Sequence, residues 1–206
     1  MGGLRGAMPL TFLTYAIGMM ALSGVPIFFS GAWTKEEILH VVSEWNPSRL
    51  PYFLMLAGVV LTALYMTRQM LYVFFGSRRE AAAHAHESPP VMTVPLAVLA
   101  VCTVLLSIFL TPAWPWLDAY LTGEKPSFNP GLLIQPGLFI SLAVVAVGIG
   151  LGVLIYRRAG AIDPLAEKAP PLFRFLENRM WLDELYDATV LAFARFAARL
   201  SDFLDR

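Results

Sequence analysis

The sequence predicts an all-α integral membrane protein with about four transmembrane helices, the first of them broken, and an amphipathic helix after the last span. Two observations support this fold class. Hydrophobic residues make up 57% of the 206 residues and charged residues 15%, well below the roughly 25% charge of an average soluble domain. Four stretches also lack Asp, Glu, Lys and Arg entirely: residues 6–34, 50–67, 88–117 and 126–156. Because about 20 apolar helical residues cross the hydrocarbon core of a bilayer, each stretch, alone or with its flanks, is long enough to span it.

The first predicted span, about residues 9–44, is interrupted by helix-breaking residues. The segment Ser23-Gly24-Val25-Pro26 stands in its middle, and Gly31 follows. As one straight helix the span would be about 54 Å long at 1.5 Å per residue, which exceeds the roughly 30 Å of the hydrocarbon core. Proline also removes a backbone donor and clashes with the preceding turn. We therefore expect a tilted or broken helix, and broken spans are tolerated where they are buried in protein or line a hydrated cavity.

Three further spans and a C-terminal polar region complete the predicted organisation. The spans are expected at about residues 51–75, 92–111 and 136–156. Residues 1–158 would form the transmembrane region, and residues 159–206 a polar linker followed by an amphipathic helix that begins near residue 183. Apolar residues recur every three or four positions along one face of that helix: Tyr186, Val190, Phe193, Ala197, Leu200 and Leu204. Such a helix lies along a membrane or protein surface.

The basic residues predict an orientation in the membrane. If the N-terminus is cytoplasmic, four spans place the loop 76–90 and the tail from residue 157 on the same side. That side then carries eleven basic residues, whereas the opposite side carries only Arg49 and Lys125. Because Lys and Arg concentrate in cytoplasmic loops, we expect a multi-pass protein of the cell inner membrane, surrounded by the lipid bilayer, with both ends cytoplasmic. The formal net charge of zero gives no reason to expect a nucleic-acid partner.

Lys35 is the main candidate for chemistry, and it follows the break directly in the segment Trp33-Thr34-Lys35-Glu36-Glu37-Ile38-Leu39. Burial destabilises the charged form of a lysine, whereas a neighbouring carboxylate such as Glu36 stabilises it. A membrane lysine under these opposed influences can change its protonation state when a nearby charge moves. His40, four residues after Glu36, would be a further relay member or an interfacial residue. The alternative is that the apolar stretch ends here and Lys35 lies at the level of the lipid headgroups.

Arg68 is the charged residue inside the second predicted span, with Tyr65 and Tyr72 on the same helix face. An intramembrane arginine is a functional candidate. However, Arg68 lies only about two turns before Gly76, so its side chain can reach the interface, and we expect a structural or pairing role. The sequence contains one cysteine, two histidines in a loop and no Gly-rich phosphate loop. We therefore expect no metal site, no cofactor site and no redox active site in this chain.

Five short motifs resemble the antiporter-like subunits of respiratory complex I. They are, in chain order, Met1-Gly2-Gly3-Leu4-Arg5; Ala21-Leu22-Ser23-Gly24-Val25-Pro26 with Gly31-Ala32-Trp33-Thr34-Lys35-Glu36-Glu37-Ile38-Leu39; Tyr65-Met66-Thr67-Arg68; His86-Glu87-Ser88-Pro89; and Trp181-Leu182-Asp183-Glu184-Leu185-Tyr186-Asp187. The motifs cover nearly the whole chain in the family's order. The chain is therefore similar to the C-terminal portion of subunit L, the subunit 5 family of NADH:quinone oxidoreductase.

The resemblance implies a role for each of these regions. Lys35 would be the lysine of a discontinuous helix in the outward half of a proton path, and Glu36 its adjacent acidic residue. The amphipathic helix would be the beginning of a long lateral helix beside neighbouring subunits. The chain would thus act as a membrane subunit of a translocase, partnered by the other membrane subunits of complex I, while electron transfer takes place elsewhere.

Departures from the family pattern leave alternatives open. A full family member has many more spans before the matching region, including a membrane glutamate and further lysines, so we expect the N-terminal half of the same subunit to be a missing partner. One alternative is a subunit of a multisubunit cation/proton antiporter or membrane-bound hydrogenase, which shares the lysine-bearing broken helix. Another is a truncated fragment with only an assembly role.

Overall fold

The computed structural model describes residues 2–26, 29–45, 47–78, 80–109, 111, 116–123, 125, 131, 136–157 and 163–205. These residues form helices and loops without a strand, which confirms the predicted all-α fold class. The chain divides into two compact units, Met1–Arg157 and Arg158–Arg206. Three of the eleven basic residues counted for the orientation, at positions 79, 158 and 206, lie outside the described residues.

The first unit contains the apolar helices. Its elements are, in chain order, η1 Leu4–Gly6, α1 Pro9–Ser23, α2 Ser30–Ser43, α3 Leu50–Phe74, η2 Glu80–Ala82, α4 Pro90–Phe109, α5 Trp116–Thr122 and α6 Pro136–Tyr156. Within the described ranges, three helices (α3, α4 and α6) are long and apolar enough to cross a bilayer. The predicted first span is indeed broken, because α1 ends at Ser23 and α2 begins at Ser30.

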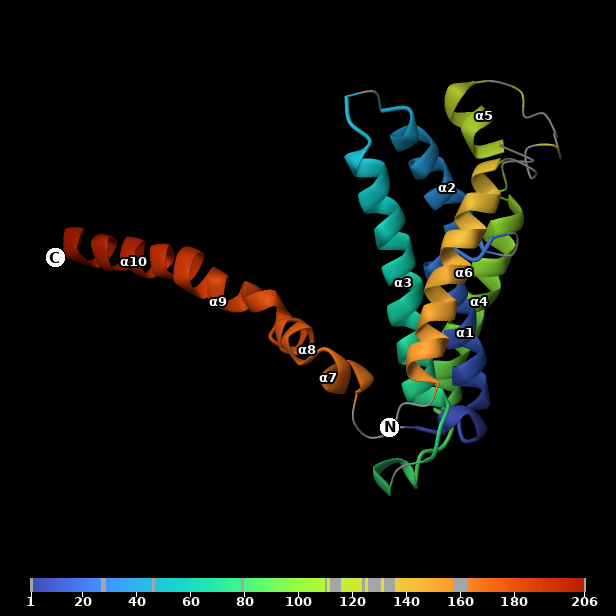
Figure 1. Ribbon diagram of the computed structural model, residues 1–206, viewed down its shortest axis with the longest axis horizontal. Coiled ribbons are helices and arrows are strands. Elements are labelled where there is room, and N and C mark those ends of the chain that lie inside the picture. The colour runs from blue at the N-terminus through green and yellow to red at the C-terminus, as the bar shows by residue number, and fades with distance from the viewer. Residues whose placement is uncertain are drawn as a thin grey trace. The chain divides into compact units, whose positions relative to one another are not determined.

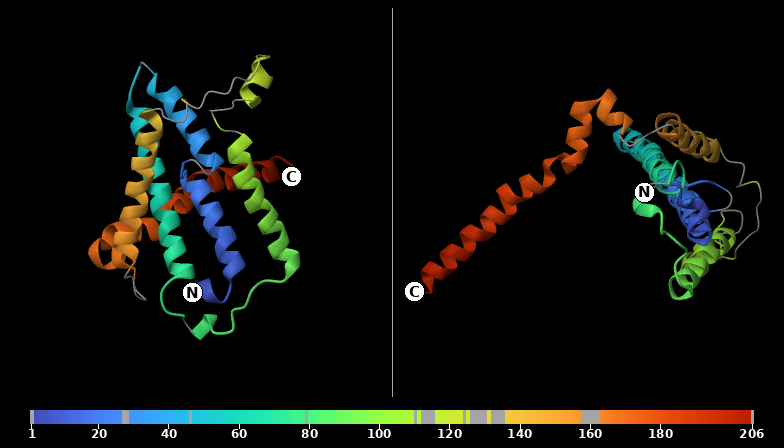
Figure 2. Two further views of the ribbon diagram at one scale, coloured as in Figure 1. Left: turned by 90° about the vertical axis from the view of Figure 1, so that its right-hand side faces the viewer. Right: turned by 90° about the horizontal axis from the view of Figure 1, so that it is seen from below.

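The helices of this unit stand side by side. In the left view of Figure 2, α6, α3, α1 and α4 follow one another across the bundle, and α2 continues beyond the end of α1. Both halves of the broken span therefore lie among the other helices: α1 contacts α3 and α4, and α2 contacts α3, α4 and α6. The end of α1 and the start of α2 therefore lie among the other helices of the bundle, which Figure 1 shows from another side.

Glycines allow α3 and α6 to approach each other closely. A Cβ atom at Gly148 would lie 2.6 Å from the backbone oxygen of Val60, and a Cβ atom at Gly152 would lie 2.8 Å from the Thr67 Cβ. Ala63, whose side chain has no exposed surface, packs in the same seam with Val145. Small residues at such contacts are the usual basis of helix association in membranes, because they bring the backbones into van der Waals contact.

The chain before α1 is tied to the chain after α3. The Gly3 N–H donates to the Phe75 carbonyl at 3.0 Å, and the Arg5 guanidinium lies 5.2 Å and 5.6 Å from the ring centres of Phe12 and Phe75. In the loop that follows, the Arg78 side chain donates to the backbone carbonyls of Ala82, the last residue of η2, and of Ala85. The N-terminal residues and this loop therefore form one layer at the same end of the bundle.

The second unit is helical over most of its length. Its elements are α7 Pro164–Lys168, α8 Pro170–Glu177, η4 Arg179–Trp181, α9 Leu182–Tyr186, the π-helical turn η5 Asp187–Leu191, and α10 Ala192–Leu204. The segment expected as a polar linker thus contains two helices. Its prolines start these helices instead of breaking them, because proline fits the first helical position. The Asp163 carboxylate caps α7 by accepting from the Leu165 N–H at 2.9 Å.

A left-handed turn separates α8 from α9. Arg179, Met180 and Trp181 have φ angles of 52°, 59° and 53°, which are uncommon for residues other than glycine. Two side-chain contacts bracket the turn: Arg179 donates to the Asp183 carboxylate at 2.6 Å, and the rings of Phe175 and Trp181 lie 5.8 Å apart. Beyond it, α9, η5 and α10 present the predicted apolar residues as exposed side chains, as expected for an amphipathic helix.

Candidate functional site

The break in the first span begins with a complete helix C-cap. Gly24 adopts a left-handed conformation with φ of 81°. Its N–H donates to the carbonyls of Met20 and Ala21, and the Val25 N–H donates to the Met20 carbonyl at 3.0 Å. This pattern is a Schellman motif, which satisfies some of the last carbonyls of a helix. The carbonyls of Leu22 and Ser23 take no part in the motif and remain available to other donors.

Lys35 supplies a donor to one of these carbonyls. Its Nζ atom donates a hydrogen bond to the carbonyl oxygen of Leu22, across the break from α2 to α1. The side chain is half-buried. Because the C-terminal end of a helix carries a partial negative charge, an ammonium group is favoured at this place. The broken helix thus creates an acceptor for a cation at the junction of α1 and α2.

Two glycines make the approach of Lys35 to α1 sterically possible. A Cβ atom at Gly24 would lie 3.0 Å from Cδ and 3.6 Å from Nζ of Lys35, so the lysine side chain lies directly against this residue. A Cβ atom at Gly31 would lie 2.1 Å from the carbonyl oxygen of Ala21, a distance at which no side chain fits. The start of α2 therefore contacts the backbone of α1, and this contact sets the position of Lys35.

Trp33 fixes α2 to the neighbouring helix α4. Its indole N–H donates to the Ser107 hydroxyl at 3.2 Å, and both side chains are buried. Ala32 and Leu39 are buried as well. The apolar residues around Lys35 thus pack into the bundle and hold the helix that carries the lysine.

Glu36 and His40 have different surroundings. The Glu36 side chain is half-buried and lies against the beginning of α6, where a Cβ atom at Gly137 would be 3.1 Å from the Glu36 Oε1 atom. His40 and Glu37 are exposed. Lys35 and Glu36 thus contact two different helices, and no hydrogen bond joins their side chains within the described residues. They are neighbours in sequence that can respond to one another's charge without forming an ion pair.

Arg68 contacts aromatic rings of two helices. Its guanidinium carbon lies 5.1 Å from the ring centre of Tyr72 on α3 and 5.4 Å from that of Tyr156 on α6. The two rings lie 5.8 Å apart. Cations are attracted to the faces of aromatic rings, so Arg68 helps to hold α6 against α3. Sequence reasoning pointed to Tyr65 and Tyr72 but missed Tyr156, because no local pattern links residues from different helices.

Glu87, which sequence reasoning used only as part of a motif, caps the N-terminus of α1. Its carboxylate accepts from the Thr11 hydroxyl at 2.5 Å and from the Leu10 N–H at 2.8 Å. The Thr11 hydroxyl bond, followed by bonds from the backbone N–H groups of Leu10, Thr11 and Ser88, holds the pKa of Glu87 below its usual value. The ionised carboxylate therefore stabilises the fold above the ordinary glutamate pKa, and this contribution is lost as the pH falls through the lowered pKa.

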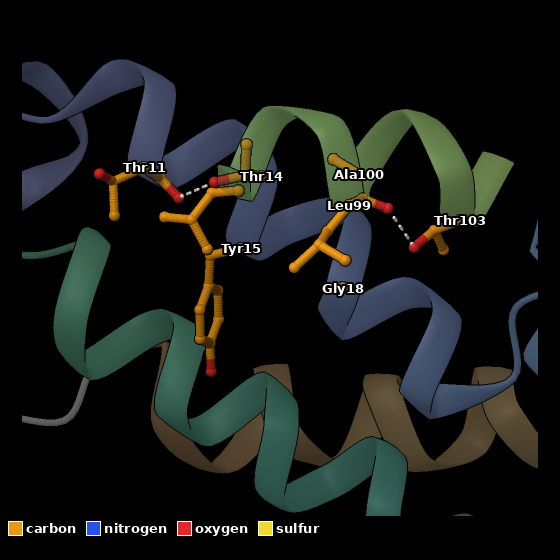
Figure 3. A pocket seen from close by; sticks show the side chains of 8 residues that line it. Thr11, Thr14, Tyr15, Gly18, Leu99, Ala100 and Thr103 are labelled. Carbon is orange, nitrogen blue, oxygen red and sulfur yellow. Dashed lines mark hydrogen bonds between the residues drawn. The ribbon is translucent and has the colours of Figure 1, made fainter. Parts of the chain in front are cut away.

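A pocket of about 250 Å³ lies between α1 and α4, and its lining is mainly apolar, unlike the surroundings of Lys35. Figure 3 shows Thr14, Tyr15 and Gly18 on one side and Leu99, Ala100 and Thr103 on the other. The hydroxyls of Thr14 and Thr103 donate to carbonyls of their own helices. Among the described residues, no cluster of three or more His, Cys, Asp or Glu side chains offers a metal site. The break at Lys35 remains the candidate site.

Comparisons with known proteins find relatives that match most of the chain. The chain is 32% identical over 97% of its length to NAD(P)H-quinone oxidoreductase chain 5 of Picosynechococcus, of which it covers 34%. It is 36% identical over 82% of its length to NADH-quinone oxidoreductase subunit L of Mycobacterium tuberculosis, of which it covers 27%. It is also 28% identical over 90% of its length to F(420)H(2) dehydrogenase subunit L of Methanosarcina mazei, of which it covers 31%.

No family model matches the chain. The chain spans about a third of the length of the curated relatives that it matches. The similarity nevertheless extends over 97% of the present sequence, a span that includes both halves of the broken helix. By these matches, the chain is similar to about a third of the length of NADH-quinone oxidoreductase subunit L/chain 5 proteins.

Proposed function

We propose that this chain forms part of the membrane portion of a proton-translocating NADH:quinone oxidoreductase, in which Lys35 and Glu36 carry protons. The observation that supports this most is the bond from the Lys35 ammonium to the free Leu22 carbonyl at the break of a membrane helix. Lysine is rare inside membrane spans because its charge is costly there, and where it occurs it commonly belongs to an ion or proton path.

The surroundings of Lys35 favour reversible protonation. The end of α1 stabilises the ammonium through one carbonyl, and the half-buried Glu36 adds a negative charge on the adjacent residue. The apolar bundle opposes the charge by desolvation. A charge that arrives or leaves nearby therefore shifts the balance between the two states of Lys35. Electron transfer in other subunits would supply that change of charge.

The relatives' names differ in the electron donor that each protein's name specifies. They specify NAD(P)H, NADH and F(420)H(2) for proteins that share the present segment. Different electron donors paired with a similar membrane segment support a role of this segment in translocation, with the redox centres on other subunits. Its partners would be the other membrane subunits of the complex and the surrounding lipid.

The proposed orientation places the N-terminus, the loop before α4 and the C-terminal tail in the cytoplasm, with the chain in the cell inner membrane. The excess of basic residues on that side supports this orientation. The bond between Gly3 and the Phe75 carbonyl supports the placement of the N-terminus and the loop at one end of the bundle. The break at Lys35 then lies towards the opposite half of the membrane.

Membership of the complex can be tested in the native host. The chain is tagged, membranes are solubilised gently, and a native gel is stained for NADH dehydrogenase activity. We expect the tag to migrate with the active high-mass band. Migration with a different complex would support an antiporter-type assembly, and migration alone would indicate a fragment without a place in the enzyme; either result contradicts the proposal.

A further inference from the structure

Ser23, the last residue of α1, carries an unexplained buried hydroxyl. Its side chain has 0% exposed surface, and its Oγ atom has no hydrogen-bond partner among the described residues. Threonine hydroxyls on the neighbouring helices are satisfied by their own backbone: those of Thr62, Thr67 and Thr103 donate to the carbonyl four residues earlier. The Tyr15 hydroxyl on α1 is also buried without a partner among the described residues, but it lies about two turns before the break. A buried hydroxyl without a partner is costly, so this atom points to a ligand.

The hydroxyl belongs to the helix end to which Lys35 of α2 donates its hydrogen bond. Ser23 stands between Leu22, whose carbonyl accepts from Lys35, and Gly24, against which the lysine side chain lies. An ammonium group has three N–H donors, and the Leu22 carbonyl is the acceptor found for Lys35 within the described ranges. A lysine with unused donors therefore contacts the residues on both sides of a serine with an unused hydroxyl.

We propose that the Ser23 hydroxyl binds a water molecule through which Lys35 exchanges its proton, which makes Ser23 a positioning residue of the path. This inference rests on the proposed function of Lys35. A buried water molecule needs two to four polar partners, and the hydroxyl, the ammonium and the helix-end carbonyls supply them. In the transfer, an N–H bond of Lys35 breaks, its electron pair stays on Nζ, and the proton forms an O–H bond on the water.

Few other charges can act on this exchange. The helices α1, α4 and α6 contain no Asp, Glu, Lys, Arg or His within their bounds, and α3 contains only Arg68. On α2 itself the titratable neighbours of Lys35 are Glu36, Glu37 and His40. A change in the pH dependence of proton transfer after a substitution at Ser23 therefore reports on the lysine and its immediate surroundings.

The test compares two buried serines in the assembled complex. Ser23→Ala removes a hydroxyl without a protein partner, whereas Ser107→Ala removes one that accepts a bond from Trp33. We expect Ser23→Ala to lower the rate of proton translocation about three- to tenfold, the effect of one lost hydrogen bond, and to alter its pH profile while thermal stability stays unchanged. Ser107→Ala should lower stability and leave the pH profile as in the wild type.

A second readout separates this inference from the proposed function. The full chain, labelled with 15N at lysine and placed in lipid nanodiscs, reports the exchange of the Lys35 ammonium protons with solvent. We expect Ser23→Ala to slow this exchange about three- to tenfold, whether or not the chain pumps. If Lys35 variants pump normally but Ser23 controls the exchange, the proposed function fails and the water site stands. Unchanged exchange and an unchanged pH profile in Ser23→Ala overturn the inference.

Discussion

Replacing Gly31 with alanine tests how the two half-helices are held together. The added Cβ atom would lie 2.1 Å from the Ala21 carbonyl oxygen, whereas ordinary contacts begin near 3.4 Å. The start of α2 must therefore move away from α1 by roughly 1 Å, because the obstacle is backbone and cannot rotate aside. Overpacking of this kind costs about 1–3 kcal/mol, and the rigid neighbour places Gly31→Ala in the upper half of that range.

The assay is equilibrium unfolding of the full chain in mixed detergent micelles, followed by circular dichroism. Gly58→Ala is the matched control, since a Cβ atom at this position of α3 meets nothing within 4 Å; it should leave stability unchanged or raise it slightly. The movement of α2 should also separate Lys35 from the Leu22 carbonyl. If Gly31→Ala unfolds at the same detergent fraction as Gly58→Ala, the close contact between the half-helices does not exist as described.

Four further substitutions test other contacts within the bundle. Glu87→Gln should reduce stability at neutral pH, and it should abolish the loss of stability that the wild type shows as acid protonates Glu87. Thermal midpoints of the wild type and of Glu87→Gln are measured against pH, and the same pH dependence in both would contradict the capping role. Arg68→Met should destabilise the chain by about 0.5–1 kcal/mol through its lost contact with the rings of Tyr72 and Tyr156, whereas Tyr156→Phe, which keeps the ring face, should have a smaller effect in the same unfolding assay. Trp33→Phe should cost about 1 kcal/mol because the bond to Ser107 is lost, and an unaltered unfolding curve would argue against that bond.

The sequence predicts the broken helix well because its causes are local. Glycine and proline near Ser23 end α1 through their backbone preferences, and charge-free stretches of sufficient length indicate the spans. The left-handed conformation of Gly24 and the helix start at Ser30 follow from the same residues. Such features depend on a few adjacent positions, so a single sequence reveals them.

The partners of the candidate residues could not be predicted in the same way. The acceptor for Lys35 is a backbone carbonyl, which every residue carries, so no residue type marks it. Likewise, Tyr156 reaches Arg68 from a helix far along the chain. A local rule would have found the helix starts within the expected polar linker, since Asp163 followed by proline is a helix-start signal. The left-handed turn at Met180 has no such local signal, because residues other than glycine rarely adopt it.

The number of protons moved per NADH oxidised tests the proposed role of Lys35 as a proton carrier. Lys35→Met is introduced into the assembled complex in membrane vesicles, and proton uptake is measured per NADH oxidised, with Lys168→Met in the second unit as a control. We expect a lower ratio of protons to NADH for Lys35→Met at normal subunit abundance, and the wild-type ratio for the control. A wild-type ratio in Lys35→Met would contradict the proposed role.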